Sequence, residues 1–139
     1  MQAKDVMSPH VEVVRPDSSI AEAAKKMKTL DVGALPVCDG ERLVGMITDR
    51  DITVEATAQS RDPNGTRVRD IMSPEIIYCF EDQDVEEAAR MMQEKQIRRL
   101  PVLSRGKELV GIVALGDLAT KTSHVKEAGN TLREVSQQA

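Results

Sequence analysis

An internal duplication constrains this 139-residue chain more than any other feature of its sequence. Val-Met-Ser-Pro at residues 6–9 returns as Ile-Met-Ser-Pro at 71–74, and the same offset of 65 aligns Leu-Pro-Val at 35–37 with Leu-Pro-Val at 100–102. After one extra residue near Gly106, an offset of 66 aligns Asp51 with Asp117. Fifteen identities occur in the same order in both halves. Because self-similarity at a fixed offset indicates repeated structural units, two copies of one unit are expected.

The duplication also sets the expected domain boundaries. We place repeat 1 at residues 1–60, a connector at 61–66, repeat 2 at 67–123 and a C-terminal extension at 124–139. The connector is rich in polar residues, Pro and Gly, which is typical of loops between structured segments.

Each repeat is predicted to follow the order β-α-β-β-α. Short apolar runs at 11–14 and 76–80 predict a first strand. The capping-box patterns Ser19-x-x-Glu22 and Asp84-x-x-Glu87 predict the helix that follows. Two hairpins come next, 34–38 with 43–48 and 100–104 with 109–114, and a second helix is expected from Arg50 or Gly116. The inward faces of the first helices are predicted to carry Ile20, Ala23, Ala24 and Met27, and Val85, Ala88, Ala89 and Met92.

The predicted fold class is therefore α+β. A three-stranded sheet with two helices leaves one apolar face uncovered, and two such units can bury that face against each other. We expect two tandem β-α-β-β-α repeats packed with pseudo-twofold symmetry around a central cleft.

Composition and charge exclude several classes of protein. Tyr78 and Phe80 are the only aromatic residues and the formal net charge is -4, so neither aromatic base stacking nor a basic surface favours nucleic acid as a partner. The longest apolar run, 109–115, is far shorter than the roughly 18 residues of a membrane-spanning helix. Asp5 and Pro9 stand where a signal peptide carries its apolar run, and the cysteine usage described next fits a reducing compartment, so a cytoplasmic location is expected.

The cysteines and histidines predict no metal site. Cys38 and Cys79 lack a Cys-x-x-Cys spacing and have apolar neighbours, which favours two buried free thiols. With His10 and His124 the only histidines, a structural zinc site is not expected. Neither histidine has a sequence partner that indicates a nucleophilic catalytic arrangement, so the chain is predicted not to be an enzyme.

The first candidate ligand group is the strand-to-helix junction at 45–51 and its copy at 111–117. Glycine within a strand allows another group to approach the backbone closely, and the Thr48 hydroxyl beside free helix amides is suited to an anion. Asp51, and Asp117 in the copy, can accept hydrogen bonds from both hydroxyls of a ribose. The alternative is that these residues are only helix caps.

The second candidate group lies just before the Leu-Pro-Val strand. Repeat 2 has Arg98 and Arg99 there, which can hold a phosphate through charge-assisted hydrogen bonds, whereas repeat 1 has Gly33 and Ala34. The alternative for the arginines is a solvated basic face.

The duplication, the Leu-Pro-Val strands and the two Gly-containing junctions together resemble the tandem CBS-domain module, most of all small two-CBS proteins of the hypoxic-response type. The resemblance spans residues 6–119. It implies a regulatory module that binds AMP, ATP, NAD or S-adenosylmethionine in the cleft between repeats and that pairs into a homodimer. By position, it implies ribose contacts from Asp51 and Asp117, phosphate contacts from Thr48, Arg50, Arg98 and Arg99, and base-pocket contacts from Gly33, Ala34, Leu35, Pro36, Leu100, Pro101, Val11 and Ile76.

The two potential sites are not equivalent. Ala114 replaces the hydroxyl residue that the family carries, Gly116 replaces a polar neighbour, and the arginines occur in repeat 2 alone. A different class of function, a ligand-free interaction module or stress-response adaptor, remains open, and the regulated protein is unknown. The dimer is expected through apolar helix faces, namely Ile20, Ala24 and Met27, Val85, Ala89 and Met92, and Ile52, Val54 and Ala56.

Overall fold

The chain forms two compact units in the computed structural model, which describes residues 1–121 and 133–135. The continuous unit is the single segment Glu12–Ile76. The split unit combines Met1–Val11 with the chain from Ile77 onward. Most of the predicted C-terminal extension, 124–139, lies outside the described residues.

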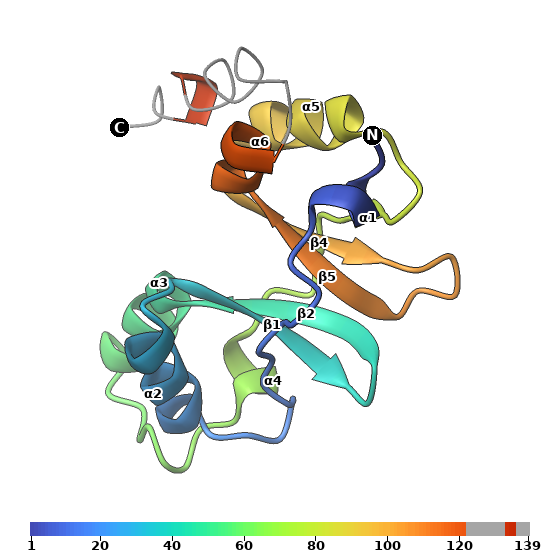
Figure 1. Ribbon diagram of the computed structural model, residues 1–139. Coiled ribbons are helices and arrows are strands. Elements are labelled where there is room, and N and C mark those ends of the chain that lie inside the picture. The colour runs from blue at the N-terminus through green and yellow to red at the C-terminus, as the bar shows by residue number, and fades with distance from the viewer. Residues whose placement is uncertain (122–132, 136–139) are drawn as a thin grey trace. The chain divides into compact units, whose positions relative to one another are not determined.

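Both units mix helices with a small sheet, which confirms the α+β class (Figure 1). The continuous unit contains α2 (Ile20–Leu30), β1 (Ala34–Asp39), β2 (Arg42–Thr48), α3 (Asp49–Asp51), the π-helix η1 (Ile52–Thr57) and α4 (Val68–Ile71). The split unit contains α1 (Ala3–Val6), β3 (Cys79–Phe80), α5 (Val85–Lys95), β4 (Arg99–Leu103), β5 (Leu109–Ala114) and α6 (Leu115–Lys121).

The longest helices begin where the capping patterns predict. The Ser19 side chain accepts a hydrogen bond from the Glu22 amide at 3.2 Å, and Asp84 accepts one from the Glu86 amide at 3.0 Å. Each helix stops at a residue in the left-handed conformation, Asp31 or Gln96. These local signals fix the ends of α2 and α5, because caps satisfy amides and carbonyls that have no partner within the helix.

The prediction that Ala24 lies in the core is wrong. All four predicted inward residues of α5 are buried, but in α2 Ala24 is exposed while Ile20, Ala23 and Met27 are buried. The matched Ala89 shares a buried cluster with Leu118 of α6. In the continuous unit the residue matched to Leu118 is Ile52, which lies in the π-helix and is only partly buried. We infer that the face of α2 that carries Ala24 is less fully packed than the matched face of α5.

The hairpins form as predicted, but the first strands are shorter than predicted. Strand β1 pairs antiparallel with β2, and β4 pairs antiparallel with β5. From the predicted strand at 11–14 only Val14 pairs, in a parallel bridge to Val37, and from 76–80 only Cys79–Phe80 pair, parallel to β4. The chain passes from one unit to the other at 11–12 and again at 76–77, so residues at these crossings do not extend the strands.

The repeated Met-Ser-Pro segment explains why the compact units differ from the sequence repeats. Ser73 and Met46 exchange backbone hydrogen bonds of 3.0 and 2.8 Å beside β2, and Ser8 and Ile112 exchange bonds of 2.8 and 3.0 Å beside β5. The start of repeat 2 thus completes the continuous unit, and the start of repeat 1, blue in Figure 1, completes the split unit. The buried residues of these two segments are Val68 and Ile71, and Ala3 and Val6.

The matched glycines of β2 and β5 are needed for this docking. A Cβ on Gly45 would lie 2.9 Å from the Ser73 carbonyl oxygen, and one on Gly111 would lie 2.9 Å from the Ser8 carbonyl oxygen. The group that approaches each glycine is therefore the chain itself. These glycines do not by themselves indicate a ligand.

We expect Gly45→Ala to lower the free energy of unfolding by about 1–3 kcal/mol, because the added methyl group overpacks a backbone contact. Gly116→Ala is the matched control, since nothing lies within 4 Å of its Cβ position and alanine favours the helix that Gly116 occupies. Urea unfolding of both variants tests this. Equal stability of Gly45→Ala and the parent chain would contradict the assignment.

Cys38 and Cys79 are both buried free thiols, as predicted. Burial raises the pKa of the Cys38 thiol and raises that of Cys79 to about 11, so both thiols stay protonated at neutral pH. Among the described residues, no helix is long and apolar enough to cross a membrane.

Candidate functional site

The two candidate ligand groups of each repeat lie together within its unit. The Asp49 amide donates to the Gly33 carbonyl at 2.9 Å, and the matched Leu115 amide donates to the Arg98 carbonyl at 2.9 Å. Strand register also pairs Ala34 with Thr48, and Arg99 with Ala114. In each unit the fold therefore places the segment before Leu-Pro-Val beside the strand-to-helix junction.

In the continuous unit the junction carries a reciprocal cap. The Asp51 amide donates to Thr48 Oγ1 at 3.0 Å, and the Thr48 amide donates to Asp51 Oδ2 at 2.9 Å. Both side chains are partly buried. Capping therefore accounts for Oδ2 of Asp51, while Oδ1 accepts no hydrogen bond from the described part of the chain.

The split unit carries half of this arrangement. The Ala114 amide donates to Asp117 Oδ2 at 2.7 Å, but Ala114 has no hydroxyl to accept in return. The junctions share their backbone geometry and their aspartate but differ in hydrogen-bonding side chains. This is the inequivalence that the sequence predicts.

Three arginines stand at the two junctions. Arg50 is exposed beside Asp49 in the continuous unit, and Arg98 and Arg99 are exposed in the split unit. Within residues 1–121 and 133–135, no ion pair involves any of the three. Their charges are accessible to an anion, which both the phosphate hypothesis and the solvated-face alternative require.

Other predicted pocket residues have buried side chains. Leu35, Pro36, Leu100 and Pro101 are all buried, and Leu35 and Leu100 belong to the hydrophobic cores of their units. The Pro36 carbonyl already accepts a hydrogen bond from the Val14 amide. Val11 and Ile76 are partly buried at the crossings between units, outside any strand. A ligand role for all six stays a prediction.

Asp49 is a polar junction residue that sequence reasoning did not select. Its Oδ1 accepts from the Arg50 amide at 2.8 Å, and its Oδ2 lies 3.1 Å from the Cβ position of Gly33. The matched residue in the split unit is Leu115, so the carboxylate occurs at one junction alone. Comparing the two copies for charge at each position would have found it.

The helix that follows Asp51 also differs between the copies. Residues Ile52–Thr57 form a π-helix, whereas residues 118–121, which match 52–55, are α-helical in α6. π-Helical turns are rare and are frequent at functional sites. Ala56 is the buried residue of η1, and Val54 is 42% exposed.

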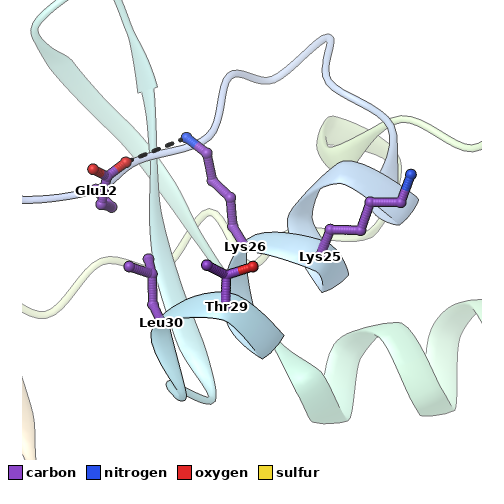
Figure 2. A pocket seen from close by; sticks show the side chains of 5 residues that line it. All are labelled: Glu12, Lys25, Lys26, Thr29 and Leu30. Atoms are coloured by element: carbon purple, nitrogen blue, oxygen red, sulfur yellow. Dashed lines mark ion pairs between the residues drawn. The ribbon is translucent and has the colours of Figure 1, made fainter.

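A surface hollow of about 300 Å³ lies elsewhere in the continuous unit (Figure 2). It lies between α2 and the segment at Glu12, where Lys26 is 3.6 Å from the Glu12 carboxylate and donates to the Val13 carbonyl at 2.7 Å. The lining residues are Glu12, Lys25, Lys26, Thr29 and Leu30, none of which was predicted to bind ligand. In the described residues, no group of three or more His, Cys, Asp or Glu side chains is arranged to hold a metal ion.

Comparison with known proteins identifies the family. The model of the CBS domain matches residues 3–56 and again residues 68–124. The chain belongs to the CBS domain family. Its two CBS domains correspond to the two sequence repeats, and the CBS domain-containing protein YhcV of Bacillus subtilis is 44% identical over 135 residues, covering 97% of this chain and 95% of YhcV.

Two solved structures are similar in both sequence and fold. Hypoxic Response Protein I, solved with two coordinated zinc ions, matches with a TM-score of 0.78 at 37% identity, covering 88% of this chain and 99% of that one. CBSX2 in complex with AMP matches with a TM-score of 0.77 at 30% identity, covering 90% of this chain and 98% of that one. This tandem CBS chain is thus similar to a hypoxic-response protein, as the sequence motifs indicate, and to a protein that binds AMP.

Proposed function

We propose that this tandem CBS protein is a regulatory module, without catalytic activity of its own, that binds an adenine-containing ligand at its strand-to-helix junctions. The observation that carries the proposal is the matched junction itself. In each unit an aspartate follows the second hairpin strand, and the segment before Leu-Pro-Val is hydrogen-bonded beside it. The similarity to CBSX2 in complex with AMP supports adenine as the base.

The proposed roles follow the positions of the side chains. Asp51 and Asp117 accept hydrogen bonds from ribose hydroxyls, and Thr48, Arg50, Arg98 and Arg99 hold phosphate. The base contacts backbone groups at Gly33–Pro36 and Leu100–Pro101, with Val11 and Ile76 beside it. AMP, ATP, NAD and S-adenosylmethionine share the adenosine that these roles require.

Thermal shift followed by calorimetric titration with adenine ligands tests the proposal. A ligand present at 100 times its Kd adds about 2.7 kcal/mol to the free energy of unfolding. We expect 2′-deoxyadenosine to bind the parent chain about 10–100-fold more weakly than adenosine, because hydrogen bonds from ribose to a carboxylate are lost. Changing the ligand rather than Asp51 leaves the Thr48–Asp51 cap intact. Equal binding of the two nucleosides would show that Asp51 and Asp117 act only as caps.

A second candidate function is a protein-interaction module that binds no small ligand. The reciprocal Thr48–Asp51 cap favours it, since capping alone gives both side chains a structural role. Absence of any thermal shift with the four adenine ligands would favour this function over the first.

Homodimer formation stays a proposal, but most of the apolar residues predicted to mediate it are buried within their own units. Ile20, Met27, Ala56, Val85, Ala89 and Met92 are all buried. Leu30, at 41% exposed, and Val54 are the large apolar residues of the continuous unit that remain available. Light scattering across micromolar to submillimolar concentrations tests the assembly.

A further inference from the structure

The two junctions differ in which of their matched positions carry a charge. In the continuous unit the first amide of α3, at Asp49, donates to the carbonyl of Gly33, the residue before β1, whereas in the split unit the first amide of α6, at Leu115, donates to the carbonyl of Arg98, the residue before β4. An exposed carboxylate in one unit thus corresponds to an apolar residue in the other, and a glycine corresponds to an exposed arginine.

When the neighbouring charged residues are included, the two junctions still differ in net formal charge. The continuous junction has Asp49, Arg50 and Asp51, with a formal sum of one negative charge. The split junction has Arg98, Arg99 and Asp117, with a formal sum of one positive charge. Among the described residues the Arg50 side chain forms no ion pair with Asp49, so no cation is paired with the exposed Asp49 carboxylate beside Gly33.

We propose that Asp49 is a specificity-determining residue that disfavours phosphate at the junction of the continuous unit. This inference rests on the proposed adenine-binding function and assigns a different ligand chemistry to each site. The split unit takes adenosine that carries a 5′-phosphate. In the continuous unit the Asp49 carboxylate opposes the phosphate contacts proposed for Thr48 and Arg50, so this unit prefers adenosine whose 5′ substituent is neutral or positively charged.

The physical reason is Coulomb repulsion close to the protein surface. A phosphate held by Thr48 and Arg50 would approach the Asp49 carboxylate, because Asp49 lies between these two residues in the chain and is exposed beside Gly33, whose Cβ position is 3.1 Å from Asp49 Oδ2. Removing one unit charge at such separations changes the affinity for phosphate by about five- to tenfold. The affinity for uncharged adenosine is unaffected by the same change.

Calorimetric titration of the full chain with AMP and with adenosine tests the proposal, using the variant Asp49→Asn. Asparagine keeps an oxygen that can accept from the Arg50 amide, and an exposed substitution of this kind alters stability little. Asp39→Asn is the matched control, because Asp39 is an exposed aspartate at the other end of the same hairpin.

In the parent chain we expect two adenosine sites of similar affinity, and one AMP site that is at least fivefold stronger than the other. Asp49→Asn should strengthen the weaker AMP site about five- to tenfold and change adenosine binding less than twofold, while Asp39→Asn changes neither. If adenosine binds but Asp49→Asn leaves both AMP affinities unchanged, the inference is wrong and the proposed function stands. If neither ligand binds the parent chain, the proposed function fails and the inference fails with it.

Discussion

Removal of residues 1–11 is expected to unfold the split unit and to leave the continuous unit folded. Ala3 and Val6 are 0% and 1% exposed and share a core cluster with Val85, Ala88 and Leu118. Their loss, with the Ser8–Ile112 backbone pairing, costs about 4–6 kcal/mol, which is comparable to the whole stability of a small domain. Hydrogen exchange read separately over 12–76 and 77–121 measures the effect.

Point variants and isolated segments sharpen this prediction. Ala3→Asp should destabilise the split unit severely, whereas Lys4→Asp, at the exposed neighbouring position, should change its stability by less than about 0.5 kcal/mol. Residues 12–76 expressed alone should fold, since they contain the whole continuous unit, whereas residues 1–60 lack Val68 and Ile71 and should not fold as a monomer. Cooperative unfolding of the 1–60 segment at concentrations where it is monomeric would contradict the observed exchange of segments.

The double variant Arg98→Ala with Arg99→Ala is expected to lose most of the preference of the protein for AMP over adenosine. Charge-assisted hydrogen bonds from two exposed arginines to phosphate account for about 10–100-fold in affinity. Adenosine affinity should change less than threefold, and the salt dependence of AMP binding should flatten, because the screened charge pairs are gone. Titration with both ligands at two salt concentrations gives all of these quantities.

The control for that experiment keeps the same change in net charge. Arg69→Ala with Arg90→Ala removes two exposed arginines from α4 and α5, outside the junctions. An equal loss of AMP preference in both double variants would show that overall charge, rather than a phosphate contact, determines the preference. An unchanged preference in the first double variant would support the solvated-face alternative.

Local sequence signals predicted the helices and hairpins because those elements depend on nearby residues. Ser19 and Asp84 cap α2 and α5, and Gly40 adopts a positive φ of 63° in the turn between β1 and β2. The repeat also predicted that Asp51 and Asp117 occupy matched junctions. The prediction that Ala24 is buried was wrong because the burial of Ala24 depends on how the second helix of the unit packs. The periodicity of a single helix carries no information about that packing.

The exchange of segments could not be read from the repeat. The identity of Met-Ser-Pro in the two halves shows that the segment recurs. It does not show whether each copy pairs with β2 or with β5. That choice depends on the path of the chain through Val11 and Ile76, where no local signal differs from an ordinary strand. The sequence predicts close approach at the glycines of β2 and β5, and in the structure the approaching group is the backbone at Ser73 and Ser8.

The exchange bears on how a two-repeat chain can arise from a one-repeat ancestor. A single repeat would contain both partners of this contact, namely a Met-Ser-Pro segment and a glycine-containing strand with which such a segment pairs. Two copies of such a chain could complete each other only by swapping these segments, so their folding would depend on protein concentration. Joining the copies makes the swap intramolecular, and the folded state then no longer depends on dilution. In this view the present chain is a covalently linked swapped dimer, whose halves are then free to diverge at positions such as Asp49 and Leu115.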